Sequence, residues 1–275
     1  MATITSKMTT ADINKMLKTN RKIVFSSGTY NLTAPLILYS NTTITCKPNA
    51  VFIRKQPYDM VRTFADKNTT VYNGCHDITW KGGQFIADTM KDTDYANIFI
   101  IVHAKNITLD NIIFEGCRGL HTIELNSSSD VTIKRQSYKP GESYREGIQI
   151  DFAFKGGVAV TGGAEPTDKC YDATHCKNIT ISKCNFIDCP DGIGTHTIYE
   201  KDIYHENIVI KDCTFTNMNK WGIKLLGMKN VTIKNCNTKV VVNKKKTAHT
   251  LTQGKVELKN YKCCSEVMID NLKVV

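Results

Sequence analysis

The stretch Asn178-Ile-Thr-Ile-Ser-Lys-Cys-Asn-Phe-Ile-Asp-Cys-Pro-Asp-Gly-Ile193 decides the fold, because its parts return along the chain. Its opening phrase is Asn or Asp, an apolar residue, Thr and a second apolar residue, kept loosely. The shortest spacings between copies are 23 and 24 residues, and longer spacings carry insertions. The alternating apolar residues predict a half-buried β-strand in each copy. The copies begin at Asn41, Asp77, Asn106, Asp130, Asn178, Asn207, Asn230 and Glu266.

Two further segments keep step with this phrase. A Cys-x-Phe pair, as in Cys184 to Phe186, follows it closely and predicts a second short strand. Three strands in about 24 residues predict one coil of a parallel β-helix, in which like residues stack and bury a continuous core. A β-sandwich is also rich in short strands, but it does not explain the fixed register. The third strands are centred on Ile123, Ile148, Ile193 and Ile223.

The N-terminal residues 1–20 predict a cap for this solenoid. A short helix is expected to begin with Thr10 as its N-cap and to place Ile13, Met16 and Leu17 on one face. Such a helix would cover the open end of the core, as terminal elements of repeat proteins do.

The rest of the chain predicts one all-β domain over residues 1–275. Residues 21–238 are expected to form regular coils, and residues 239–275 an irregular C-terminal coil. The chain stops on strand-like sequence. We therefore expect a further domain, a partner subunit in a homo-oligomer, or segment 239–264 to cover that end.

Composition bounds the function classes. The 275 residues are 41% hydrophobic and 23% charged, which excludes wholesale disorder. No apolar run reaches the roughly 18 residues that span a bilayer, so we expect no membrane association. No export signal is visible, and either a virion or the cytoplasm remains an option for the location. The 11 cysteines are odd in number and mostly share one repeat position, which predicts free buried thiols. The net charge of +10 suits an acidic partner, but no aromatic-basic pattern indicates nucleic acid binding.

The outward positions of the third strand carry the candidate functional residues, because they collect carboxylates and a histidine on neighbouring coils. Coils stack about 4.8 Å apart, so Asp151 and His196 are expected within reach of one substrate bond. Long loops follow both residues, and long loops in a compact domain are usually functional. The second loop ends with Tyr204 and His205, which are expected to overhang the cleft. The other candidates are His121, Glu124, Glu146, Gln149, Asp191, Trp221 and Lys224.

Several of these residues also have an ordinary structural explanation. Asp191 fits a turn between Pro190 and Gly192, and Asp151 can accept hydrogen bonds from loop amides at a strand end. No paired Cys-x-x-Cys is present, so the sequence predicts no metal site and no cofactor.

The repeated Asn-Ile-Thr-Ile, Cys-x-Phe and Gly-Ile pattern, with the entry strand Phe25-Ser-Ser-Gly-Thr-Tyr30, resembles the right-handed parallel β-helix proteins of the pectate-lyase-like superfamily. Within it the chain is most similar to polygalacturonase-like glycoside hydrolases and to related Gram-positive bacterial and phage tail proteins. Polygalacturonases carry acid, Gly-His-Gly and Arg-Ile-Lys motifs on successive coils. Here Asp151, His196 and Lys224 stand at the corresponding places, with Gly222 instead of the arginine and without an Asp-Asp pair.

The resemblance implies a carbohydrate-active enzyme that cleaves a polysaccharide, which the basic charge would allow to be acidic. Hydrolysis needs two carboxyl groups that flank the glycosidic bond. We assign this pair to Asp151 and Asp191, with Glu146 in reserve and His196 orienting a carboxylate. The substrate-binding residues are expected to be His205, Tyr204, Lys224, Gln149, Glu124, His121 and Trp221. A polysaccharide lyase and a non-catalytic glycan-binding tail or adhesin module are the alternatives.

Overall fold

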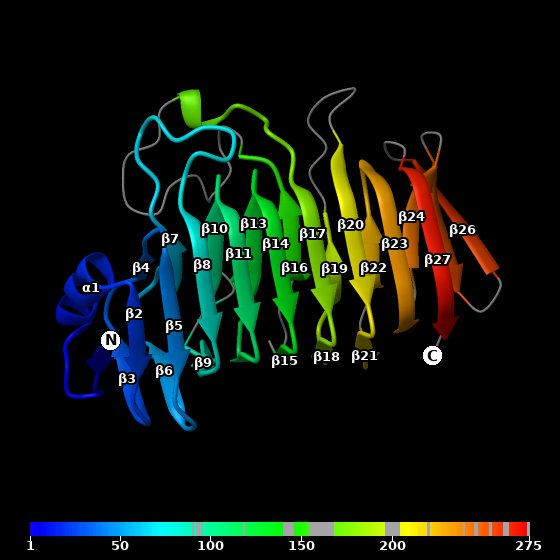
Figure 1. The fold of residues 1–275 in the computed structure, drawn as a ribbon. Coiled ribbons are helices and arrows are strands. Elements are labelled where there is room, and N and C mark those ends of the chain that lie inside the picture. Colours follow the sequence, from blue (N-terminus) through cyan, green and yellow to red (C-terminus); the bar gives the residue numbers. More distant parts are fainter. Residues whose placement is uncertain are drawn as a thin grey trace.

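The computed structural model is a right-handed parallel β-helix with three strand ladders that run the length of the molecule (Figure 1). It confirms the predicted fold. The structure describes residues 1–89, 91, 94, 96–117, 119–139, 146–153, 168–195, 204–218, 221–238, 240–244, 247–252, 255–260 and 264–273.

Ladders 1 and 2 together form a 17-stranded sheet. Their strands pair in parallel at the spacing of one coil, so equivalent residues of successive repeats become neighbours. Ladder 1 contains β1 (Ala2–Ile4), β2 (Lys22–Phe25), β5 (Thr42–Cys46), β8 (His76–Lys81), β11 (Lys105–Asp110), β14 (Ser129–Lys134), β17 (Lys177–Ser182), β20 (His205–Lys211), β23 (Met228–Asn237) and β27 (Ser265–Lys273). Ladder 2 contains β3 (Gly28–Leu32), β6 (Ala50–Arg54), β9 (Gln84–Ile86), β12 (Ile113–Glu115), β15 (Ser137–Lys139), β18 (Asn185–Ile187) and β21 (Thr214–Thr216).

Ladder 3 forms a second sheet and carries the candidate functional residues. The predicted central isoleucines lie in register, with Ile123 beside Ile148, Ile148 beside Ile193, and Ile193 beside Ile223. The strands are β4 (Leu36–Leu38), β7 (Val61–Thr63), β10 (Phe99–Val102), β13 (Ile123–Asn126), β16 (Glu146–Asp151), β19 (Asp191–Gly194), β22 (Trp221–Leu225) and β24 (Val240–Lys244).

The residue that opens each repeat phrase lies in the left-handed region of backbone conformation. The eight φ values run from 51° at Asn230 to 61° at Asn41, which explains the preference for Asn and Asp. Their side chains also bond from coil to coil. Asn230 donates from Nδ2 to Oδ1 of Asn207 at 2.7 Å, and Asn207 donates to Asn178 at 2.8 Å. We call this exposed stack the asparagine ladder: Asp77, Asn106, Asp130, Asn178, Asn207 and Asn230.

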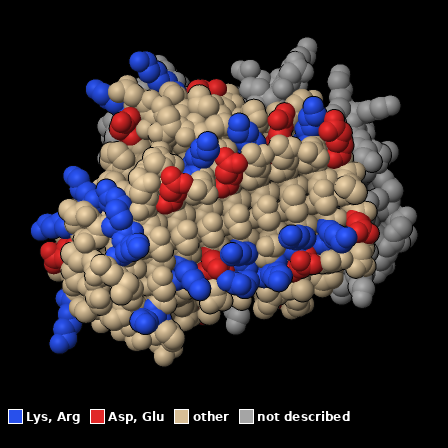
Figure 2. Space-filling view, viewed as in Figure 1, with Lys and Arg blue, Asp and Glu red and all other residues tan. Residues whose placement is uncertain are grey.

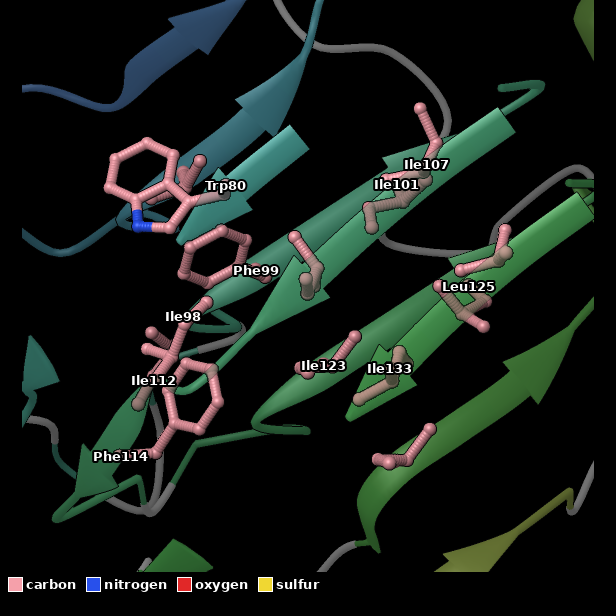
Figure 3. Close-up of a cluster of buried hydrophobic side chains, with 14 of the residues drawn as sticks. Trp80, Ile98, Phe99, Ile101, Ile107, Ile112, Phe114, Ile123, Leu125 and Ile133 are labelled. Carbon is pink, nitrogen blue, oxygen red and sulfur yellow. The ribbon is translucent and has the colours of Figure 1, made fainter. Parts of the chain in front are cut away.

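The core between the ladders is a stack of like side chains (Figure 3). The ring of Tyr138 lies 4.4 Å from that of Phe186, and Phe186 lies 4.8 Å from Phe215, with each pair nearly parallel. Such offset aromatic stacking adds to the energy of apolar burial. Every cysteine in the described residues is a free thiol, nearly all of them buried, which confirms that expectation.

The helix α1 (Thr10–Thr19) caps the N-terminal end as predicted, and Ile13 and Leu17 are buried beneath it. Its N-cap is Thr9 rather than the expected Thr10. The Thr9 hydroxyl accepts from the amide of Asp12 at 3.2 Å, whereas the buried Thr10 hydroxyl donates to a carbonyl of the next coil. In the described part of the chain, no helix has the length and apolar character that crossing a membrane requires.

Near the C-terminal end, β24 adds in parallel to β22, and two antiparallel strands extend the sheet from there. These strands are β25 (Thr247–Thr252) and β26 (Lys255–Asn260). Strands β24, β25 and β26 therefore widen the sheet of ladder 3. An oligomer through this end stays a prediction.

The outer face of ladder 1 shows an uncharged band with charged residues along both borders (Figure 2). Threonines of successive coils occupy equivalent positions on ladder 1, for example Thr108 beside Thr132. Oppositely charged side chains of neighbouring strands in ladder 1 come together, such as Lys234 of β23 and Asp270 of β27 at 3.1 Å. The net positive charge is therefore not gathered into one basic patch on this face.

Candidate functional site

Two glycines set the direction of the acidic side chains on ladder 3. A Cβ added to Gly147 would lie 3.0 Å from the ring of Phe186, and one added to Gly192 would lie 2.6 Å from the ring of Phe215. Both glycines thus face the core, as do the isoleucines that follow them. The acids before them turn to the outer face instead.

These acids belong to a row of unlike polar residues that crosses six successive coils. We call it the polar row: Asp59, Asn97, His121, Glu146, Asp191 and Trp221. Several of its side chains accept a hydrogen bond from the backbone amide of the next coil. Asp59 Oδ1 accepts from the amide of Asn97 at 2.6 Å, and Asp191 Oδ1 accepts from the amide of Trp221 at 3.2 Å. The row therefore caps backbone groups and holds buried polar side chains at the same time.

Glu146 is a buried acid of the polar row with two basic neighbours. Its Oε1 receives the ammonium group of Lys224 at 3.1 Å, and its Oε2 lies 3.3 Å from Nδ1 of His121. The side chain is only 2% exposed. It reaches Lys224 across Gly194, which lies between Gln149 and Lys224 in the register and has no side chain to block the contact. An ammonium group at this distance stabilises the charged carboxylate.

Glu124 has the opposite environment. Its two carboxyl oxygens accept from the side-chain amides of Asn97 at 2.7 Å and Asn126 at 3.1 Å. No lysine or arginine binds it in the described residues. Burial raises the pKa of this carboxyl above its ordinary value of 4.5. Glu124, expected only to bind substrate, is thus a candidate proton donor.

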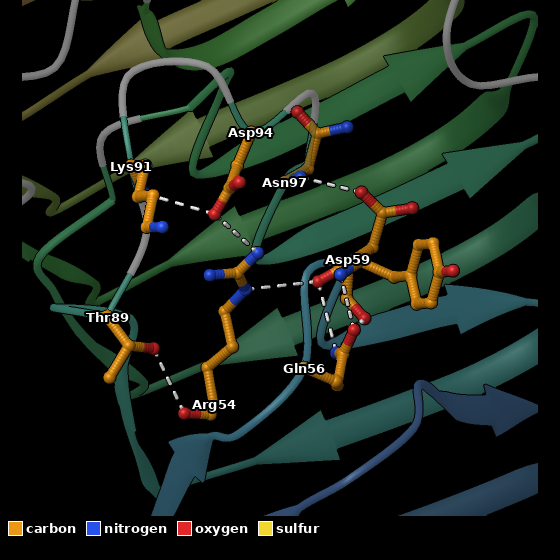
Figure 4. A network of polar contacts seen from close by, with 8 residues as sticks. Arg54, Gln56, Asp59, Thr89, Lys91, Asp94 and Asn97 are labelled. Atoms are coloured by element: carbon orange, nitrogen blue, oxygen red, sulfur yellow. Dashed lines mark hydrogen bonds and ion pairs between the residues drawn. The ribbon is translucent and has the colours of Figure 1, made fainter.

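A network of polar contacts continues from Asn97 toward the N-terminus (Figure 4). Asp59 accepts a hydrogen bond from Nε of Arg62 at 2.7 Å, and Arg54 donates one to Asp94 at 3.0 Å. Burial raises the pKa of Asp59 against the pull of the nearby arginines. These residues were not predicted from the sequence, because the third strand was aligned only from Ile123 onward. The same alignment carried back to Phe99 and Val61 places Asn97 and Asp59 in the row of His121.

Asp151 lies at the other end of strand β16 from Glu146. The register pairs Glu146 with Asp191, so five residues, or roughly 16 Å, separate Asp151 from that pair along the strand. A hydrolytic carboxylate pair needs about 5 to 9.5 Å, so the expected pairing of Asp151 with Asp191 does not fit the register. Asp151 instead accepts from the amide of Phe152 at 2.8 Å and from Gln149 at 3.0 Å. His196 lies outside the described residues.

His205 does not overhang the cleft, contrary to the expectation. It is buried where the chain enters ladder 1, stacked 4.3 Å from the ring of Phe152. Its Nδ1 accepts from the amide of Cys176 at 3.0 Å, and burial lowers its pKa to about 3. A neutral capping role therefore explains this histidine. Tyr204, next to it, is partly exposed.

Part of the long loop after Asp151 packs on the segment that follows β7. Asp172 accepts from the amide of Val71 at 2.6 Å, and Tyr72 donates to the carbonyl of His175 at 2.7 Å. The ring of His103 lies between the two segments. Its Nδ1 lies 2.8 Å from the carbonyl oxygen of Val71, and its Nε2 lies 2.8 Å from that of Cys170. These contacts fix both segments beside the Asp151 end of ladder 3. Nowhere in the described parts do three His, Cys, Asp or Glu side chains gather closely enough to hold a metal ion.

The described site thus unites five predicted residues on one face: His121, Glu124, Glu146, Asp191 and Lys224. Trp221 ends the polar row and is partly exposed, and Gln149 is buried between Glu124 and Gly194. Asp151 lies at the other end of β16, and His205 lies in ladder 1 at the start of β20.

No family model matches the sequence, and no curated protein matches it either. Solved structures do share the fold. The surface adhesin PfbA of Streptococcus pneumoniae is 20% identical with a TM-score of 0.64, over 82% of this chain and 56% of that one. ORF18 of Geobacillus virus E2 is 10% identical with a TM-score of 0.58, over 86% and 48%. The tailspike of Escherichia coli bacteriophage HK620, solved in complex with a pentasaccharide, is 9% identical with a TM-score of 0.55, over 96% and 45%. The chain thus spans about half the length of these proteins, and the likeness confirms the parallel β-helix.

Proposed function

We propose that the protein hydrolyses a glycan on the outer face of ladder 3, with Glu124 as general acid and Glu146 as general base. One observation carries the proposal: two buried carboxyl groups on neighbouring strands have opposite environments. Burial raises the pKa of Glu124 against the hydrogen bonds from Asn97 and Asn126, while Lys224 stabilises the charge of Glu146. A pair of acids whose environments separate their protonation states is what glycosidic hydrolysis requires.

The backbone register supports this pair. Glu124 lies beside Gln149, three residues beyond Glu146, which puts the two Cα atoms roughly 11 Å apart. Both side chains approach His121: Glu146 directly, and Glu124 through Asn97, whose Oδ1 accepts from the amide of His121. An inverting mechanism, which leaves room for a water between the two carboxyl groups, would require them to lie about 6.5 to 9.5 Å apart.

Asp191 is the register partner of Glu146, and we infer that it supports the base. One of its oxygens is engaged by the amide of Trp221, so its position is fixed by the backbone. A second carboxylate beside Glu146 keeps the potential at this point negative, which favours a general base and the positive charge that develops on the sugar.

The fold neighbours support a glycan as the ligand. The HK620 tailspike was solved with a pentasaccharide, and PfbA is a surface adhesin. Both are large proteins of which this chain spans about half, so the resemblance favours the ligand class rather than a reaction.

The test is a panel of bacterial and plant polysaccharides assayed for new reducing ends. Glu124→Gln and Glu146→Gln should each lower the rate at least about 100-fold, because each removes one proton-transferring group. Wild-type activity should fall as the pH rises through the pKa of Glu124, at a pH above the ordinary 4.5, since the acid must be protonated. Full activity in either variant would refute the assignment. An equal loss in Asp151→Asn would move the reaction to the other end of β16, as the sequence first suggested.

Glycan binding without cleavage is the second candidate, and the backbone contacts of Asp151 and Asp191 favour it. Each of these carboxylates accepts from a main-chain amide, as purely structural residues do. Retention on an immobilised glycan with no rise in reducing ends would support a binding module. An increase in ultraviolet absorbance from an unsaturated product would instead indicate a lyase.

A further inference from the structure

A compact patch of apolar and cationic side chains lies on the outer face of ladder 3, two strands from Glu124. The register sets Ile37 beside Arg62. One step further, the rings of Tyr39 and Phe64 stack with centroids 5.3 Å apart and 23° between their planes. Phe64 is 38% exposed, which is unusual for a large apolar side chain on this face. Flat exposed rings of this kind offer a surface to the C–H face of a sugar.

Arg62 is held in a defined orientation. Its Nε donates to Oδ2 of Asp59 at 2.7 Å, and Asp59 is 4% exposed and fixed by the amide of Asn97. Within the described ranges, no other hydrogen bond or ion pair engages the two terminal nitrogens of Arg62, and the side chain is 25% exposed. A guanidinium group oriented in this way presents a planar fork that matches a carboxylate or a phosphate.

We propose that this patch binds an anionic sugar unit, with its carboxylate or phosphate group on Arg62 and its ring against Phe64 and Tyr39. The inference rests on the proposed function only for the ligand class, a glycan. Arg62, Ile100 and Glu124 occupy one row of successive strands, so the anionic group would lie about 10 Å along the solenoid axis from Glu124. The glycan would then run parallel to the axis, with the charged unit a short distance from the cleaved bond.

Three probes that share one ring separate charge from shape: glucuronic acid, glucose 6-phosphate and glucose. Each is titrated into isotope-labelled protein while the Nε–H signal of Arg62 and the ring signals of Phe64 are followed by NMR. The anionic probes should shift both sets of signals, and glucose should bind at least about tenfold more weakly. The stronger of the two anions identifies the group that the fork prefers.

Arg62→Lys keeps the charge next to Asp59 but loses the fork, so it should weaken the anionic probes about tenfold without unfolding the protein. Arg135→Lys is the control, because Arg135 also binds a carboxylate, that of Asp110, through Nε and a terminal nitrogen. Equal binding of glucose and the two anions, or equal effects of the two lysine variants, would overturn the proposal. The probes report binding alone, so this test gives a clear result even if Glu124 catalyses no hydrolysis.

Discussion

The asparagine ladder and the polar row are both stacks of polar side chains on successive coils, yet they differ in every other respect. In the asparagine ladder like residues bond to one another at the surface, as Asn207 does with Asn178 and Asn230. In the polar row the residues are unlike and all but Trp221 are buried, and Glu146 reaches sideways to Lys224. Repetition of one residue type therefore stabilises the stacking of the coils. A change of residue type from coil to coil, combined with burial, instead indicates a candidate binding site.

The largest expected effect tests whether the inward glycines create the polar row. Gly192→Ala would bring a methyl group to 2.4 Å from the carbonyl of Gly222 and 2.6 Å from the ring of Phe215. Overpacking of this kind should cost about 3 kcal/mol of the free energy of unfolding, measured by denaturant titration.

Gly194→Ala is the control from the same strand. Its added methyl group faces outward, 3.2 Å from the carbonyl of Lys224 and 3.4 Å from Cγ of Glu146, so it should cost less than about 1 kcal/mol. A similar loss in both variants would mean that the strand rejects any side chain here, and that the inward turn of Gly192 does not set the direction of Asp191.

The second prediction removes the cation from the polar row. Lys224→Met leaves Glu146 buried without its ammonium partner, which should cost about 2 kcal/mol because an uncompensated buried charge is unfavourable. Lys229→Met is the matched change in the exposed pair with Glu266, 3.9 Å apart, and should cost less than about 0.5 kcal/mol. Thermal unfolding of the two variants decides the matter, and equal melting temperatures would contradict a charged Glu146.

Sequence alone was sufficient for the repetitive part of the molecule. The phrase opened by Asn178, the Cys-x-Phe strand and the central Ile193 each recur, and recurrence in a solenoid fixes both the register and the buried face. The cap was one residue out, because Thr9 and Thr10 are chemically equal candidates and only the packing of Thr10 against the next coil separates them.

The site was only partly predictable because its chemistry depends on burial, which a repeat does not report. Glu124 and Asp151 have the same sequence signature of an outward acid. Both accept from side-chain amides, but Asp151 also accepts from the backbone amide of Phe152. His205 looked like a loop residue because the sequence does not show that the amide of Cys176 needs an acceptor. Asp59 was missed because its coil carries Val61 instead of the usual isoleucine.

The third prediction turns to the asparagine ladder. Asn207→Ala removes two side-chain hydrogen bonds and places an alanine at a φ of 58°, so it should cost about 1.5 kcal/mol. Asn207→Gly removes the same bonds but tolerates the backbone, so its cost should be smaller by about 1 kcal/mol. If the two variants unfolded at the same denaturant concentration, the left-handed conformation would not be the reason for asparagine at this position.

The smallest effect is a gain, and it arises where the asparagine ladder is interrupted. Asn178 donates to Asp130 at 2.8 Å, but the carboxylate of Asp130 has no proton to donate to Asn106, as an asparagine would. Asp130→Asn should supply that bond and raise the free energy of unfolding by roughly 0.5 kcal/mol, or about 1 to 2 °C in melting temperature. Asp212→Asn removes the same charge next to Asn235, but its neighbour on the preceding coil, Lys183, offers no side-chain oxygen. That variant should not gain stability. An equal rise in both would show that removal of negative charge, rather than a continuous row of amides, stabilises this corner of the coil.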